Sequence, residues 1–220
     1  MSAWIAYNVL AGVVAYLCGS VPTGYWMGKL LRGIDIREHG SKSTGATNVL
    51  RTLGKAPALI ALAIDLLKGV AAVTFARWLL RSSGVAASAP GSIDFNGWLS
   101  WMTVIAALLA VVGHSRSIFI RFTGGKSAAT GLGVLLAVSW PVGLGTALCF
   151  VGVLALSRIV SLSSISATIA AVVLMLILAQ PIAFLVLAVV GAAYVVLRHK
   201  QNIHRLIAGT EPRIGQASQN

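Results

Sequence analysis

The residues best suited to chemistry in this chain lie in two glycine-rich segments that carry basic side chains. The first runs from Gly40 to Arg51 and reads Gly-Ser-Lys-Ser-Thr-Gly-Ala-Thr-Asn-Val-Leu-Arg. Glycines let the main chain turn tightly and present its N–H groups, hydroxyls donate to ligand oxygens, and a guanidinium binds two oxygens at once. The hydroxyl, amide and guanidinium groups come from Ser41, Thr47, Asn48 and Arg51. The segment therefore predicts an anion-binding turn that leads into a helix.

The second segment places Gly124, Gly125 and Lys126 directly before a stretch of small residues. It is not a nucleotide-binding P-loop, because that pattern needs a glycine five residues before Gly125, where this chain has Ile120, and a preceding strand, where this chain has an apolar segment. Adjacent glycines, a mobile ammonium group and a following helix still favour the binding of a phosphate group.

Several polar residues allow both a structural and a functional interpretation. The glycines and hydroxyls after Gly40 could form a plain flexible loop, with Asn48 as a helix cap. Asp65 and Lys68 lie three residues apart in an apolar stretch, which is typical of a buried ion pair, although Lys68 could also reach a substrate.

Polar residues in the last third of the chain allow the same two interpretations. Ser161, Ser163 and Ser164 could cap a helix or donate to a ligand. His199 and Asn202 are spaced to face one neighbour if the helix continues through them. Histidine is more often structural than functional, but this pair lies at the end of an apolar stretch, near other polar segment ends.

The supply of catalytic acids and metal ligands is small. The chain has five acidic residues and four histidines, no histidine has Asp or Glu five positions later, and no two are four apart. A histidine–carboxylate general base and a metal site are therefore not expected, and we expect no cofactor. Cys18 and Cys149 lie in apolar stretches and are expected to be free thiols.

The elements that must position these groups are membrane-spanning helices. Of the 220 residues, 57% are hydrophobic and 10% are charged. The apolar stretches lie at about 3–27, 56–80, 98–113, 126–142, 143–157, 164–179 and 181–198. Some are shorter than the ~20 residues that a full span needs, so we expect tilted or broken helices. The prediction is an all-α, polytopic transmembrane bundle of seven spans, forming a single domain over residues 1–220.

The basic residues indicate how the chain is oriented in the membrane. The net charge of +12 alone would suggest a nucleic-acid partner. With the N-terminus outside, however, fourteen of the seventeen Lys and Arg residues fall in loops or tails on the inner side: Lys29, Arg32, Arg37, Lys42, Arg51, Lys55, Arg116, Arg121, Lys126, Arg158, Arg198, Lys200, Arg205 and Arg213. We therefore predict an outside N-terminus and a cytoplasmic C-terminus, and no nucleic-acid partner.

Taken together, the motifs resemble one family. They are Gly19-Ser-Val-Pro-Thr-Gly24, the Gly40–Arg51 segment, Asp65-Leu-Leu-Lys68-Gly69, Gly113-His114 with Phe119 and Gly124-Gly125-Lys126, and Arg198-His199 with Asn202 and Gly209-Thr-Glu211. The chain is similar from end to end to the bacterial acylphosphate:glycerol-3-phosphate acyltransferases. The resemblance implies a seven-span enzyme of the bacterial inner membrane that moves a fatty acyl group from acyl phosphate to the 1-position of glycerol 3-phosphate, giving lysophosphatidic acid.

The resemblance also implies the residues of the site. The catalytic set is Ser41, Arg51, Lys126, His199 and Asn202, and the substrate-binding set is Thr47, Asn48, Lys68, Gly124, Gly125 and Ser164. Because acyl phosphate is already activated, binding and charge neutralisation could supply most of the rate, and a substrate phosphate could accept the hydroxyl proton. The implied partners are both substrates and membrane lipids, with the protein a monomer and its active site facing the cytoplasm.

The chain departs from the usual family pattern at four positions, and two other functions compete. Ser43 stands where Asn is usual, Thr44 replaces Pro or a small apolar residue, Thr123 replaces Lys, and Ser127 replaces Gly. A channel or transporter would also use broken spans with glycines at polar ends, but it predicts paired halves and a polar path, which the sequence lacks. A non-catalytic scaffold leaves Arg51, Lys126 and His199 unexplained.

Overall fold

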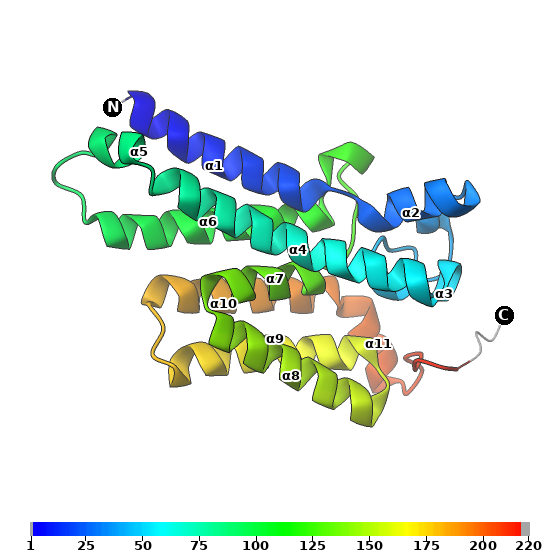
Figure 1. The fold of residues 1–220 in the computed structure, drawn as a ribbon. Coiled ribbons are helices and arrows are strands. Elements are labelled where there is room, and N and C mark those ends of the chain that lie inside the picture. The colour runs from blue at the N-terminus through cyan, green and yellow to red at the C-terminus, as the bar shows by residue number, and fades with distance from the viewer. Residues whose placement is uncertain (1, 217–220) are drawn as a thin grey trace. The chain divides into compact units, whose positions relative to one another are not determined.

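The computed structural model describes residues 2–216, which form helices joined by short loops and turns (Figure 1). The helices of the first part are α1 (Ser2–Ser20), α2 (Thr23–Arg32), η1 (Ile36–Glu38), α3 (Ala46–Leu53), α4 (Lys55–Leu80), α5 (Ser83–Ser88), α6 (Phe95–Ser115), η2 (Ile118–Ile120) and α7 (Ala128–Val138). Those of the second part are α8 (Trp140–Ser157), α9 (Val160–Ile177), α10 (Ile182–Arg198) and α11 (Lys200–Ile207). The all-α prediction is confirmed.

The chain divides into two compact units, residues 1–138 and residues 139–220. In the first unit α1, α4 and α6 pack together and α7 packs along α4; in the second, α9 packs against α8, α10 and α11. Residue 1 and residues 217–220 lie outside the described part. The single domain over residues 1–220 therefore stays a prediction.

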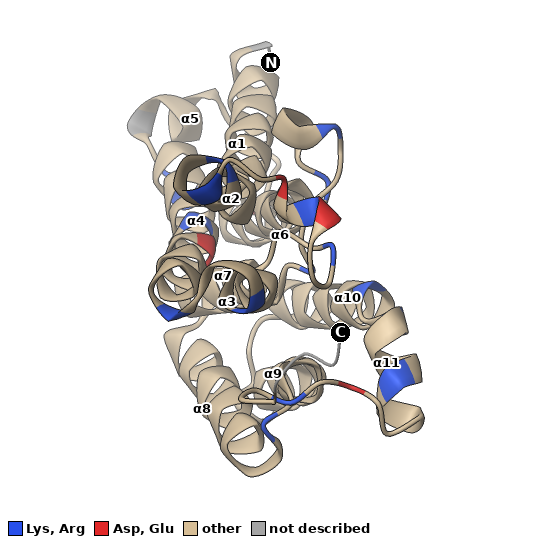
Figure 2. Ribbon diagram, turned by 90° about the vertical axis from the view of Figure 1, so that its right-hand side faces the viewer, with Lys and Arg blue, Asp and Glu red and all other residues tan. Residues whose placement is uncertain are grey.

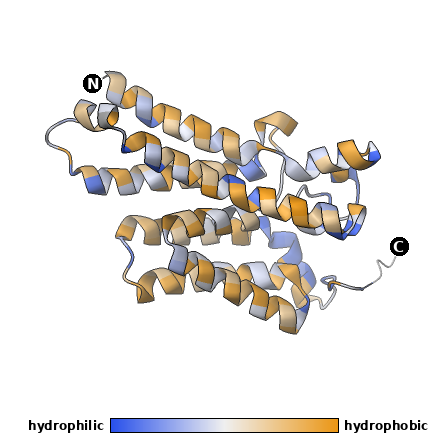
Figure 3. Ribbon diagram, in the orientation of Figure 1, coloured by the Kyte–Doolittle hydropathy of each residue, from blue (hydrophilic) through white to orange (hydrophobic). Residues whose placement is uncertain are grey.

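The helices have the composition of membrane spans (Figure 3). Five described segments are long and apolar enough to cross a bilayer: Ala3–Arg32, which joins α1 and α2, and α4, α6, α8 and α9. Helices α10 and α11 qualify together as a pair bent by 64°, and α7 is a shorter apolar helix. The predicted stretches 56–80, 98–113, 143–157, 164–179 and 181–198 each lie largely on one helix. The stretch 3–27 covers α1 and part of α2, and 126–142 covers α7 and the start of α8. The count of seven full spans stays a prediction.

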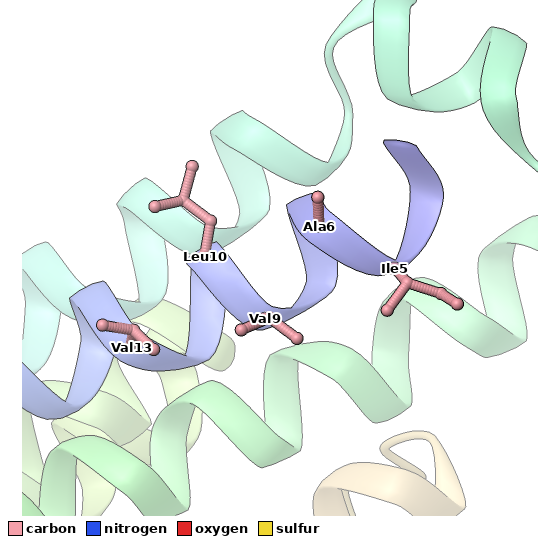
Figure 4. A pocket seen from close by; sticks show the side chains of 5 residues that line it. All are labelled: Ile5, Ala6, Val9, Leu10 and Val13. Carbon is pink, nitrogen blue, oxygen red and sulfur yellow. The ribbon is translucent and has the colours of Figure 1, made fainter. Parts of the chain in front are cut away.

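Large apolar side chains lie on the outside of these helices, as expected of surfaces that face lipid. On α8, for example, Leu156 is 90% exposed. Helix α1 carries an open apolar groove lined by Ile5, Ala6, Val9, Leu10 and Val13 (Figure 4). A soluble protein rarely exposes so much apolar surface.

Small residues allow the helices of the first unit to approach closely. A Cβ atom on Gly133 of α7 would collide with the carbonyl oxygen of Leu66 on α4, and one on Gly69 of α4 would collide with that of Thr130 on α7. Gly19 of α1 and Gly113 of α6 are in similar contact with the facing main chain. Such small-residue contacts drive helix association in membranes, where the hydrophobic effect between helices is absent.

The close contact between α4 and α7 predicts a position-specific effect of adding one methyl group. Gly133→Ala should destabilise the protein by about 1–3 kcal/mol, because the new Cβ pushes the two helices apart. The matched control is Gly131→Ala on the same helix, where a Cβ meets no atom within 4 Å. Thermal unfolding in detergent should show a lower Tm for Gly133→Ala alone. Equal Tm values for the two variants would contradict the packing.

Candidate functional site

The first glycine-rich segment is organised by the side chain of Asn48, which is buried on α3. Its Nδ2 donates to the carbonyl oxygens of Ile36 at 3.0 Å, His39 at 3.0 Å and Ser43 at 2.8 Å. Its Oδ1 accepts from the N–H of Ser41 at 2.8 Å. Helix α3 has Gly45 at its N-cap without a side-chain cap, so the capping interpretation of Asn48 is wrong. Asn48 instead binds the main chain of the turn before α3.

The ligand-type groups of this turn lie around Asn48. Ser41 follows Gly40, whose φ is +57°, and precedes Lys42, whose φ is +55°, so the main chain is left-handed on both sides of it. Thr47 and Arg51 are four residues apart on α3 and therefore share a helix face. Ser41 and Thr47 are partly buried, whereas Arg51 is exposed. The Ser41 hydroxyl thus lies in the turn that Asn48 holds, and the Arg51 guanidinium on the following helix is accessible.

The second glycine-rich segment lies against the end of α6. A bridge between Ser117 and Thr123 closes the loop before it, and the N–H of Gly125 donates to the carbonyl oxygen of His114 at 3.2 Å. A Cβ on Gly125 would collide with the imidazole ring of His114. Glycine is therefore required here for close packing. The Gly125 N–H, which the sequence suggested as a ligand donor, is used inside the protein.

Ser127 starts the turn into α7. It has a φ of +62°, a conformation in which glycine is least strained. Its hydroxyl donates to the carbonyl oxygen of Val111 at 2.7 Å, a bond that glycine cannot make. Lys126, directly before it, is half-buried. The tight turn expected with Ser127 is present, and it holds Lys126 at the end of α6.

Asp65 and Lys68 form the buried ion pair that the sequence allowed. Lys68 Nζ lies 2.8 Å from Asp65 Oδ1 and donates to the carbonyl oxygen of Val21 at 2.9 Å. Thr23 donates to the same carboxylate at 3.1 Å, and His114 Nδ1 lies 3.6 Å from it. This cluster joins α4 to the break between α1 and α2 and to α6. It gives Lys68 a structural role, with both of these contacts inside the protein.

The second unit gathers its polar residues around Glu211, a residue that the sequence analysis did not place in the site. Glu211 Oε1 accepts from Asn202 Nδ2 at 2.5 Å and from the Ser161 hydroxyl at 2.8 Å, and Oε2 accepts from Arg205 Nε at 2.7 Å. Burial alone would raise the pKa of Glu211, but these three hydrogen bonds lower it below its ordinary value. The ionised carboxylate thereby ties α9, α11 and the segment after α11 together.

The remaining predicted residues of the second unit lie on α9 and at the bend between α10 and α11. Ser164 donates to the carbonyl oxygen of Val160 at 2.9 Å, and α9 has no side-chain cap, so capping by these serines is wrong. His199 lies at the bend, and its Nδ1 is 2.7 Å from the carbonyl oxygen of Val195. Because a carbonyl only accepts, Nδ1 carries a proton, and Nε2 of the neutral ring is an acceptor.

The predicted site residues divide between the two units. The first holds Ser41, Thr47, Asn48, Arg51, Lys68, Gly124, Gly125 and Lys126, and the second holds Ser164, His199 and Asn202. In the first unit, Lys and Arg residues lie on the ends of α2 and α3 and in the adjoining loops (Figure 2). The signal that could have found Glu211 is its scarcity, since it is one of only five acidic residues.

Comparison with known proteins gives one consistent result. A family model described as glycerol-3-phosphate acyltransferase matches residues 9–209. The glycerol-3-phosphate acyltransferase of Acaryochloris marina is 54% identical over 216 residues, covering 98% of this chain and 96% of that protein. Glycerol-3-phosphate acyltransferase 2 of Rhizobium johnstonii is 54% identical over 220 residues, covering 98% and 99%.

A solved structure agrees with these relatives. The crystal structure of PlsY (YgiH), an integral membrane glycerol 3-phosphate acyltransferase in its glycerol 3-phosphate form, superposes with a TM-score of 0.82. Its sequence is 37% identical, and the match covers 94% of this chain and 96% of that one. The lysophosphatidic acid form of the same protein gives a TM-score of 0.79 at 36% identity. The chain therefore belongs to the glycerol-3-phosphate acyltransferase family of multi-pass membrane proteins.

Proposed function

We propose that the protein transfers a fatty acyl group from acyl phosphate to the 1-position of glycerol 3-phosphate, giving lysophosphatidic acid and phosphate. The observation that carries this proposal is the pair of glycine-rich turns in the first unit, each built around fixed main-chain contacts and each bearing a basic side chain. Arg51 lies exposed on the helix behind the first turn, and Lys126 is held at the second. Two phosphate-bearing substrates require two such groups of donors.

The proposed reaction needs little from the protein beyond binding and charge neutralisation. The 1-hydroxyl oxygen of glycerol 3-phosphate attacks the carbonyl carbon of acyl phosphate, the new C–O ester bond forms, and the bond to the phosphate oxygen breaks. Phosphate leaves with the bonding electrons, and a substrate phosphate takes the hydroxyl proton. Arg51, Lys126 and the Ser41 hydroxyl stabilise the negative charge as it moves to the leaving group.

Residues of the second unit orient the acceptor substrate in this proposal. His199, whose Nδ1 lies 2.7 Å from the Val195 carbonyl oxygen, would contact glycerol 3-phosphate from the bend after α10. Asn202 is fixed by Glu211, which holds its amide group in one orientation. Thr47 and Ser164 supply further hydroxyl contacts. Asn48 and Lys68, each engaged with main-chain or carboxylate groups, support the site from behind.

The membrane position follows from the same reasoning. Basic residues at the ends of α2 and α3, in the loop before α7 and after α10 support a cytoplasmic active site, with the N-terminus outside and the C-terminus inside. The exposed cations Lys29 and Arg32, and the half-buried Arg205 that also binds Glu211, would contact anionic lipid headgroups of the bacterial inner membrane. We propose that the enzyme acts as a monomer.

The proposed activity predicts the outcome of an assay on purified protein in detergent. The protein should form lysophosphatidic acid from glycerol 3-phosphate and palmitoyl phosphate, but not from palmitoyl-CoA. Arg51→Ala and Lys126→Ala should each lower kcat/KM by about a hundredfold or more, since each removes a charge-assisted phosphate contact worth about 3 kcal/mol. Product analysis by mass spectrometry measures both effects.

The control for this assay is Arg32→Ala, which removes an exposed cation at the end of α2. It should leave kcat/KM within about twofold, as surface substitutions usually do. Lack of product from both donors would overturn the enzyme assignment. Product from palmitoyl-CoA alone would overturn acyl phosphate as the donor, and full activity of Arg51→Ala and Lys126→Ala would overturn their roles.

The absence of a general base from the proposed mechanism can be tested at Asp65. Asp65→Asn should lower Tm strongly, because loss of one partner of a buried ion pair costs about 3–5 kcal/mol. Lys68→Met in the same chain should recover part of that loss. The folded fraction of Asp65→Asn should still turn over. A folded variant with normal affinity for both substrates and no turnover would instead identify Asp65 as a protein base.

A further inference from the structure

Arg37 contacts both loops that carry the proposed phosphate-binding groups of the first unit. It lies in η1, within the segment that Asn48 holds, and its Nη1 donates to the Thr123 hydroxyl at 2.9 Å and to the carbonyl oxygen of Ile120 at 3.1 Å. Thr123 directly precedes the Gly124–Lys126 turn. The Thr123 hydroxyl also donates to the Ile120 carbonyl at 2.7 Å. Arg37, Thr123 and Ile120 therefore form a closed set of hydrogen bonds.

The guanidinium of Arg37 is fixed on its other sides as well. Asp35 binds it in a bidentate manner, with 2.9 Å from Nε to Oδ1 and 2.6 Å from Nη2 to Oδ2. The Tyr25 ring on α2 lies 4.9 Å below its Cζ atom. The hydrogen bond from Arg37 lowers the pKa of Asp35 to about 2, so the carboxylate stays ionised at neutral pH. A side chain held in this way has lost its rotamer freedom before any substrate binds.

We propose that Arg37 is a positioning residue for acyl transfer, which fixes the Gly124–Lys126 turn relative to the turn before α3. The steps of this connection are short. Asn48 binds the Ile36 carbonyl, one residue from Arg37, and α3 carries both Asn48 and Arg51. Arg37 then reaches Thr123, three residues from Lys126. The proposal rests on the function proposed above, because it assumes that both turns bind phosphate groups.

This geometry also gives Thr123 a role. The Thr123 hydroxyl accepts from Arg37 and donates to the Ile120 carbonyl, so its size and both its hydrogen-bonding capacities are used. A lysine at this position would place a second cation beside Arg37 and could not accept its hydrogen bond. The uncharged Thr123 side chain is therefore suited to orienting the Arg37 guanidinium.

The test is a double-mutant cycle on the full-length protein in detergent, with KM, kcat and Tm measured for each variant. Arg37→Lys keeps the charge but loses the planar guanidinium that binds Asp35 and Thr123 at the same time. It should raise KM for glycerol 3-phosphate or palmitoyl phosphate about tenfold, with kcat changed less than about threefold. Thr123→Val should raise the same KM about threefold, since the Ile120 bond of Arg37 remains. Tm should change by less than about 2 °C in both.

Non-additivity decides the result. On the Arg37→Lys background, Thr123→Val should have little further effect on KM, because the bond that it removes is already lost. The matched control, Arg121→Ala, removes an exposed cation from the same loop and should leave KM unchanged. Independent, multiplicative effects of Arg37→Lys and Thr123→Val, or a KM for Arg37→Lys equal to that of Arg121→Ala, would overturn the proposal. An inactive wild-type protein would instead refute the underlying function.

Discussion

The hydrogen bonds of the Asn48 amide are the interaction on which the first glycine-rich turn depends. The main chain between α2 and α3 is irregular, and its polar groups need partners. One buried side chain satisfies three carbonyl groups and one N–H of this segment. Its removal would leave these groups unpaired, and the cost of each buried unpaired group is about 1–3 kcal/mol. The positions of Ser41, Arg37 and the start of α3 all follow from it.

Two buried carboxylates likewise provide partners for polar groups inside the protein. Asp65 joins α4 to the break between α1 and α2, and Glu211 joins α9 to α11. Each carboxylate gathers several donors, so each acts as a fixed point between helices. Polar side chains that face other protein groups are thus buried, while Arg51 is exposed and Lys126 is half-buried.

Much of the fold could be predicted from the sequence, because apolar stretches of this length have few alternatives. The stretch 56–80 agrees with α4 to within one residue at its start. The stretch 3–27 falls within one candidate span, Ala3–Arg32, and this span is broken as expected: α1 ends at Ser20, and α2 begins after Pro22, whose ring removes an N–H donor. The condition set for His199 and Asn202, a helix that continues through them, is not met, since α10 and α11 meet there at a bend of 64°.

The contacts that organise the site could not be predicted, because they join residues far apart in the sequence. The bond from Arg37 to Thr123 spans 86 positions, and that from Ser161 to Glu211 spans 50. Hydrophobic periodicity contains no information about such pairs. The sequence predicted that Gly124 and Gly125 present N–H groups to a ligand. It did not predict that the His114 ring packs on Gly125 and leaves no room for a Cβ atom. The serines after Arg158 similarly bind other protein groups and cap no helix.

In the proposed mechanism, a preformed turn held by the Asn48 amide binds substrate phosphate. The most direct measurement is the affinity of an Asn48→Asp variant for glycerol 3-phosphate, determined by calorimetry on detergent-purified protein. Aspartate keeps the acceptor for the Ser41 N–H but loses every donor to the three carbonyls. We predict a folded protein that binds glycerol 3-phosphate at least about tenfold more weakly. Unchanged affinity in the folded variant would contradict the account.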